Sequence, residues 1–172
     1  GILIVLGFIF VWVEMKTPGV GVPLVLAMTS FGLVFFGHYL VGLAQMDFDI
    51  SINYAKERVQ FGRPIGSFQA IQHKCADMVT DVDGSRFIMY KAAWSISSGQ
   101  PAGETSIAVN MAKAWCSEAT RRVVAHGQQI HGGIGFTKDY KIQLFYRRQK
   151  RAELAFGDAD FHRELVAQQL GL

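Results

Sequence analysis

Cysteine is scarce in this chain of 172 residues, which contains only Cys75 and Cys116. The two lie far apart, and neither belongs to a CxxC pair or a Cys/His cluster. This pattern excludes a disulfide-stabilised scaffold and a structural zinc site, and it predicts two reduced thiols inside helices. Reduced thiols agree with a cytoplasmic location for the part of the chain that carries them.

Charge is nearly absent from the first quarter of the chain. Before position 46, the only acid is Glu14 and the only lysine or arginine is Lys16. Both charges lie in a polar turn, residues 14–19, which is flanked by two apolar runs, residues 1–13 and residues 20–44. Because about 20 apolar residues can cross a bilayer, we expect residues 1–44 to form an apolar, transmembrane helical hairpin. A buried helix pair of a soluble protein is the alternative.

This first segment resembles the membrane region of NfeD-type proteins. The residues that carry the resemblance are Glu14, Thr17-Pro18-Gly19-Val20-Gly21-Val22-Pro23 and Phe35-Phe36-Gly37-His38-Tyr39-Leu40. The resemblance implies association with a membrane. It implies no chemistry, since His38 has neither a carboxylate nor a cysteine near it in the sequence.

Positive charge is also modest. The net charge is +3, and no run of lysine and arginine marks a nucleic-acid surface. The mixed charges between Arg147 and Glu153 are typical of a solvated helix face. No Ser/His/Asp order, phosphate loop or metal-ligand spacing occurs.

From residue 41 onward, apolar residues recur three or four positions apart, which predicts amphipathic helices. The first helix is expected to end near residues 61–64, and Ser67 is expected to cap the next one. Further helices are expected over residues 71–96, 105–130, 140–153 and 159–169, with Asp158 and Asp160 at the start of the last.

Two of these helices show one-sided patterns. The second has a seam of Ile71, Cys75, Met78, Val82, Ser85, Met89, Ala92 and Ile96. The third places Ala108, Ala112, Trp115, Ala119, Val123, His126 and Ile130 on one side. Such seams predict antiparallel packing. The expected fold class is all-α: an up-and-down four-helix bundle over residues 45–172, preceded by the apolar hairpin.

Two groups of residues have the chemistry of a nucleotide site. If helical, Arg58 and Phe61 share a face, where a guanidinium can hold phosphates and a ring can stack. After the third helix, Gln129 precedes Gly132 and Gly133, whose bare backbone a ligand can approach closely. Each group also has a structural interpretation, as a packed surface arginine and as an ordinary helix C-cap.

Several motifs together, in order and spacing, resemble the C-terminal domain of the acyl-CoA dehydrogenases. They are Tyr54-Ala55-Lys56-Glu57-Arg58-Val59-Gln60-Phe61-Gly62-Arg63-Pro64-Ile65, Phe68-Gln69-Ala70-Ile71-Gln72, Ala76-Asp77-Met78, Trp94, Ala112-Lys113-Ala114, Gln129-Ile130-His131-Gly132-Gly133-Ile134-Gly135 and Tyr140. The resemblance covers about residues 42–172.

This resemblance implies an FAD-dependent oxidoreductase that dehydrogenates acyl-CoA thioesters between the α and β carbons. It implies an oligomer with FAD at the subunit interface. By the same resemblance, Arg58 holds the pyrophosphate, Phe61 packs near the adenine, and Gln129, Gly132 and Gly133 line the ADP portion. Phe68 and Gln69 also approach the cofactor.

The sequence departs from the family at the catalytic base. Where the resemblance places a Glu-Gly pair, this chain has Phe156-Gly157, and phenylalanine cannot accept a proton. A second position used in some branches falls near Gly32, where no acid stands. Glu153 and Asp158 are close in sequence, but their helical offset directs them elsewhere.

The family's N-terminal helical domain and middle β-domain are also missing from this sequence. We therefore expect activity only together with other domains or a partner subunit. The alternative is a module without catalysis, either a membrane-anchored helical module or an inactive partner subunit.

Overall fold

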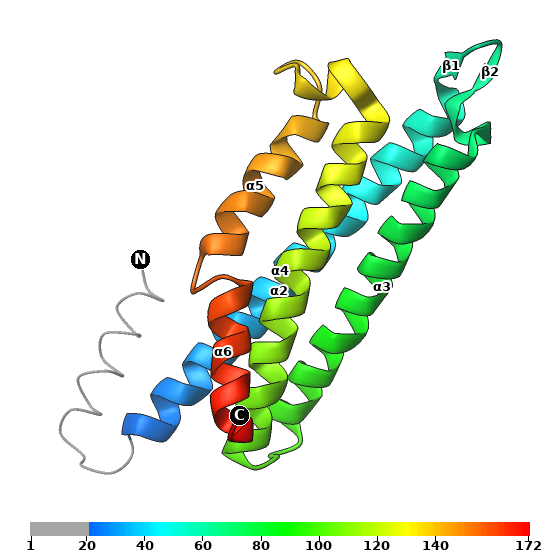
Figure 1. The fold of residues 1–172 in the computed structure, drawn as a ribbon. Coiled ribbons are helices and arrows are strands. Elements are labelled where there is room, and N and C mark those ends of the chain that lie inside the picture. Colours follow the sequence, from blue (N-terminus) through cyan, green and yellow to red (C-terminus); the bar gives the residue numbers. More distant parts are fainter. Residues whose placement is uncertain (1–20) are drawn as a thin grey trace.

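The computed structural model describes the backbone of residues 21–172 and the side chains of Met28 and of residues 32–172. Five helices form most of this part: α2 (Gly21–Glu57), α3 (Gln69–Ser97), α4 (Ala102–His131), α5 (Ile142–Leu154) and α6 (Ala159–Leu170). In Figure 1, α3 runs antiparallel to the long helices α2 and α4, while α5 and α6 follow one another along α4. The predicted all-α, up-and-down bundle is confirmed. The two short helices α5 and α6 together take the place of its fourth helix.

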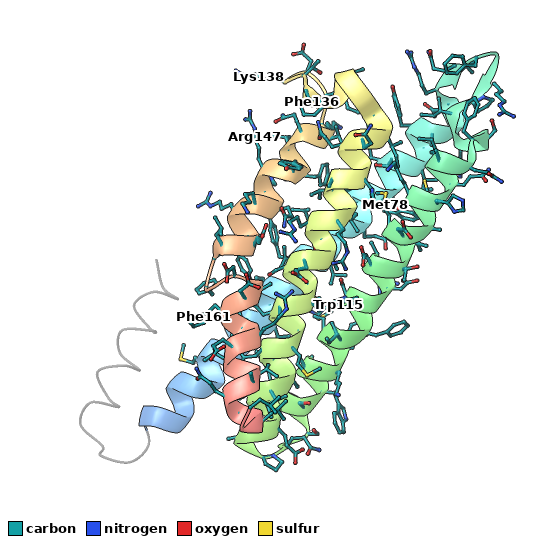
Figure 2. The ribbon with its side chains drawn as sticks, in the orientation of Figure 1. Met78, Trp115, Phe136, Lys138, Arg147 and Phe161 are labelled. Carbon is teal, nitrogen blue, oxygen red and sulfur yellow. The ribbon has the colours of Figure 1, made fainter. Side chains whose placement is uncertain are left out.

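The core forms where the predicted seams meet. Met78, Val82 and Met89 of α3 are fully buried, and Figure 2 shows Met78 on α3. On α4, the small residues Ala108, Ala112 and Ala119 are buried as well, which allows the helices to approach closely. Both cysteines are free thiols: Cys116 is buried and Cys75 is half-buried.

Trp115 differs from its predicted position in the core, since 42% of its surface is exposed. The indole lies at the edge of the α3–α4 contact, where Gly84 leaves room for it. A Cβ atom at position 84 would lie 3.2 Å from Trp115 Cζ2. The four-and-three periodicity placed this residue on the correct helix face, but the ring is too large to enter between two closely packed helices.

The prediction of a transmembrane hairpin is not supported. Its first arm, residues 1–20, lies outside the described residues. Its second arm belongs to α2, which continues without a break through the expected domain boundary at residues 44 and 45. Within the described part of the chain, no helix is long and apolar enough to cross a membrane. Leu40, Leu43 and Ala44 instead pack into the clusters that join α2 to the other helices.

Two helix boundaries also differ from the predictions. Helix α2 ends at Glu57, before a hairpin of β1 (Val59–Gln60) and β2 (Arg63–Pro64), so residues 58–64 are not helical. Phe68, not Ser67, occupies the N-cap of α3, and the Ser67 hydroxyl donates to Pro64 O over 2.7 Å. Asp158, in contrast, caps α6 by accepting from the Phe161 amide, which confirms its predicted place.

Candidate functional site

The end of α4 is held in place by a buried aromatic contact. The His131 ring stacks on the Tyr54 ring of α2, with ring centroids 4.3 Å apart. Its Nδ1 lies 2.7 Å from Gly127 O, one turn earlier in the helix. Burial lowers the pKa of His131, although the Gly127 carbonyl opposes this shift. The contact therefore fixes the last turn of α4 without adding a charge to the core at neutral pH.

A pocket of about 620 Å³ opens beside this helix end, between α4, the 3-10 helix η2 (Gly132–Phe136) and α5. Gly132 has φ 61°, and a Cβ atom at Gly132 or Gly133 would meet nothing within 4 Å. The backbone at these two glycines is therefore open to a ligand. The pocket is lined by Ala125, Gln128, Gln129, Gly132, Gly133, Phe136, Gln143, Tyr146 and Arg147.

Two amide oxygens in this pocket wall have no partner. Gln128 Oε1 and Gln143 Oε1 are buried and make no hydrogen bond with the described part of the protein. A buried acceptor without a donor is costly, and both oxygens lie inside the pocket wall, away from its open surface. Arg147, which Figure 2 shows on α5, adds a positive charge at the edge of the same pocket.

The second predicted group lies on the hairpin after α2. Arg58 is exposed, and Phe61 at the turn is 92% exposed with φ 54°. The prediction that Arg58 and Phe61 share a helix face is therefore wrong, because the chain forms a hairpin there with Phe61 and Gly62, both at positive φ, in its turn. Phe68 lies edge-on to Phe61, with centroids 6.1 Å apart.

The structure brings only part of the predicted site together. Gln129, Gly132 and Gly133 line one pocket, whereas Arg58, Phe61, Phe68 and Gln69 lie outside it. The hairpin and η2 are nevertheless at the same end of the bundle in Figure 1. One large ligand, or one neighbouring subunit, can therefore meet both groups.

Sequence reasoning missed several residues of this site. Gln143 and Arg147 are four positions apart on α5, and this spacing could have placed them on one face next to the glycine bend. Arg63 was missed too, although its guanidinium carbon lies 4.1 Å from the centroid of the Phe68 ring. No sequence signal distinguishes Gln128, which is buried, from Gln129, which is exposed.

The position expected to carry a catalytic base holds Phe156, and the two acids close to it in sequence have other contacts. Phe156 is 69% exposed, has φ 62°, and contacts Phe36 edge-on at 5.4 Å between centroids. Glu153 accepts from Gln149 Nε2 at 3.0 Å, and Asp158 caps α6. Both acids are thus occupied in holding helices.

Comparisons with known proteins agree with this architecture. The family model described as acyl-CoA dehydrogenase, C-terminal domain, matches residues 21–171. Probable acyl-CoA dehydrogenase YngJ of Bacillus subtilis is 42% identical over 130 residues, which cover 76% of this chain and 33% of YngJ. The 3-(aryl)acrylate reductase of Clostridium sporogenes is 36% identical over 141 residues, covering 82% of this chain and 37% of the reductase.

Solved structures show the same fold. Butyryl-CoA dehydrogenase from Megasphaera elsdenii superposes with a TM-score of 0.80 at 28% identity, covering 86% of this chain and 38% of that one. The FAD complex of PigA gives a TM-score of 0.74 at 26% identity, covering 79% of this chain and 35% of PigA.

The extent of these matches has two consequences. The chain spans little more than a third of the relatives it matches. The family match also includes residues 21–44, so the resemblance of this segment to an NfeD-type membrane region is not supported. The chain belongs to the acyl-CoA dehydrogenase family, and residues 21–171 correspond to its C-terminal domain.

Proposed function

We propose that this chain supplies the C-terminal bundle of an FAD-dependent acyl-CoA dehydrogenase, which oxidises acyl thioesters between the α and β carbons. The observation that carries the proposal is the open-backbone pocket at the end of α4, built by Gln129, Gly132 and Gly133. Several relatives are named as acyl-CoA dehydrogenases, and one as an acryloyl-CoA reductase. Bound FAD would supply the hydride acceptor.

The pocket suits the nucleotide half of FAD. It offers the exposed amide of Gln129 and the open backbone of Gly132 and Gly133, which can donate to and accept from polar groups of a nucleotide. Arg58 and Phe61 are exposed on the hairpin, where they can reach a cofactor held by a neighbouring subunit. In this arrangement Arg58 pairs with the pyrophosphate and Phe61 packs near the adenine, while Phe68 and Gln69 also approach the cofactor.

The assembly is proposed to be a homo- or hetero-oligomer. The relatives are much longer than this chain, so other domains or a partner subunit must complete the flavin-ring pocket and the acyl-CoA site. One relative is named as a subunit of a caffeyl-CoA reductase–Etf complex. This name supports the interpretation that members of the family act within larger assemblies.

An inactive partner subunit is the second candidate, and Phe156 favours it. A side chain that cannot take a proton stands where the family resemblance places the base, and the nearby acids Glu153 and Asp158 are engaged in helix contacts. In this version the chain contributes cofactor contacts to a catalytic subunit and performs no chemistry itself.

Flavin retention tests the proposal. We expect the chain, co-purified with a full-length catalytic relative, to retain FAD and show visible flavin absorbance. Arg58→Ala is expected to weaken retention about tenfold, because a charge-assisted contact to phosphate is lost. Arg148→Ala, an exposed arginine on α5, serves as the matched control and should retain FAD.

The outcomes separate the possibilities. If the wild-type assembly holds no flavin beyond the amount held by the relative alone, the flavoprotein function of this chain is wrong. If R58A and R148A retain flavin equally, only the role of Arg58 is wrong.

A further inference from the structure

The turn between α5 and α6 has an unusual backbone. Phe156 and Gly157 both have positive φ, at 62° and 95°. Gly157 is required by space, since a Cβ atom there would overlap the Phe161 ring. No steric contact of this kind requires a positive φ at Phe156. A bulky residue in the left-handed region is strained and persists only where the surroundings impose it.

Helix α4 holds the first side of this turn through a buried lysine. Lys113 is 1% exposed, and its ammonium donates to Glu153 O at 3.1 Å, to Ala152 O at 3.4 Å and to Ser117 Oγ at 2.9 Å. The two carbonyls belong to the last turn of α5, where a positive charge is favourable. Lys113 therefore fixes the point at which the chain leaves α5.

Helix α4 holds the second side through a buried histidine of α6. Asn110 is three residues before Lys113, so both side chains leave α4 on the same face. Asn110 Oδ1 lies 2.7 Å from His162 Nδ1. On the other side of the ring, His162 Nε2 lies 3.0 Å from Phe156 O. Both neighbours of the ring are oxygen acceptors, so it donates to both only when each nitrogen carries a hydrogen, whereas a neutral ring donates to one of the two.

The side chain at position 156 is consequently held in one direction. The Phe156 ring lies edge-on to Phe36 of α2 and borders a cavity of about 540 Å³. This cavity lies between α2, α4 and α6, and its lining is mostly apolar: Met28, Gly32, Leu33, Phe161 and Leu165.

We propose that Asn110, Lys113 and His162 are positioning residues that impose the left-handed backbone at position 156, so that whichever side chain stands there is held beside this cavity. The inference rests on the proposed function, in which position 156 is the place of the family's proton-abstracting carboxylate. In this chain the three residues that would orient the base are present, although phenylalanine stands at the position of the base.

Fluorine NMR at a single site tests the inference on the whole chain. With 4-fluorophenylalanine incorporated at position 156, the Phe36 ring current should displace the ¹⁹F resonance from its value in the unfolded chain. In His162→Leu the displacement should be lost, because the turn can relax. His162→Gln should keep it, since the glutamine amide can still donate to Phe156 O.

A second labelled position controls for general loosening. Phe87 on α3 is as exposed as Phe156 but lies on a regular helix. The ¹⁹F resonance of 4-fluorophenylalanine at position 87 should be the same with and without H162L. If H162L does not fold, Asn110→Ala removes the other partner of the ring and should produce the same loss at position 156.

The inference is overturned if the displaced resonance at position 156 survives both H162L and N110A, because the turn would then hold its own conformation. It is also overturned if H162Q behaves like H162L, since the hydrogen bond to Phe156 O would not be the cause. No flavin is needed in this experiment, so its failure is distinguishable from a failure of the proposed function.

Discussion

Among single residues, Asp47 stands out as an acid inside the helical core. It is fully buried, its Oδ2 has no partner among the described residues, and its one hydrogen bond, from the Ser51 hydroxyl, is long at 3.5 Å. Burial raises the pKa of Asp47 to about 8, and the hydrogen bond from Ser51 opposes this shift. The folded state therefore holds this proton more strongly than the unfolded chain does.

This pKa predicts how stability varies with pH. Below pH of about 4, Asp47 is neutral in both states and carries no penalty. As pH rises toward 8, the unfolded chain ionises while the folded one cannot, so folding is disfavoured by roughly 4 kcal/mol at pH 7. Asp47→Asn should flatten this fall in the free energy of unfolding between pH 4 and 8, measured by urea titration.

The neighbouring exposed acid on α2 provides a control. Asp49→Asn should leave the slope of stability against pH unchanged, since its side chain faces solvent. If D47N and wild type lose stability in parallel over this range, Asp47 does not carry the pH dependence.

At the level of helices, the contact between α2 and α4 depends on Gly127. A Cβ atom there would overlap the Asp47 carboxyl group and would lie 2.9 Å from Ser51 Oγ. Alanine is a better helix former than glycine by about 1 kcal/mol, so propensity alone favours the substitution. The overlap involves two buried side chains with little room to move, and we expect it to dominate.

Gly127→Ala is therefore expected to destabilise the bundle by about 1–3 kcal/mol, measured as the free energy of unfolding. Gly103→Ala, in the first turn of the same helix, should instead be neutral or stabilising by up to ~1 kcal/mol, because nothing lies within 4 Å of its Cβ position. Equal effects at the two positions would contradict the close approach of α2 and α4 at Gly127.

The helix predictions succeeded where one-sided patterns were long. The seam from Met78 to Ala92 lies in the core, because about four turns of regular spacing define a face whatever the partner is. The predictions failed where the chain changes direction. Residues 58–64 continue the helical pattern for a few positions, but the turn at Phe61 and Gly62 pairs the residues on either side of it as a hairpin.

For the molecule as a whole, the buried clusters of the described residues join α2, α3, α4 and α5. All four clusters draw their members from the helices between Leu33 and Ala152.

The candidate site was only partly accessible from sequence, and the part that was missed is informative. Motif order indicated Gln129, Gly132 and Gly133, because a bare backbone after a helix is a local property. The unpartnered oxygens of Gln128 and Gln143 come from different helices, and their meeting in one pocket wall follows from packing. The contacts that hold the turn at position 156 likewise come from α4, α5 and α6 together.

The sequence alone determined the helical class, the order of the helices, the family and the presence of phenylalanine at position 156, because periodicity, motif order and residue type are written along the chain. Tertiary structure decided that the apolar residues 40–44 serve the bundle core, that Asp47 is buried, and that Lys113 and His162 hold the turn at Phe156. These outcomes depend on which helix lies opposite each side chain. The residues that bury or bind one another are far apart in sequence, so only the packing of the helices brings them together.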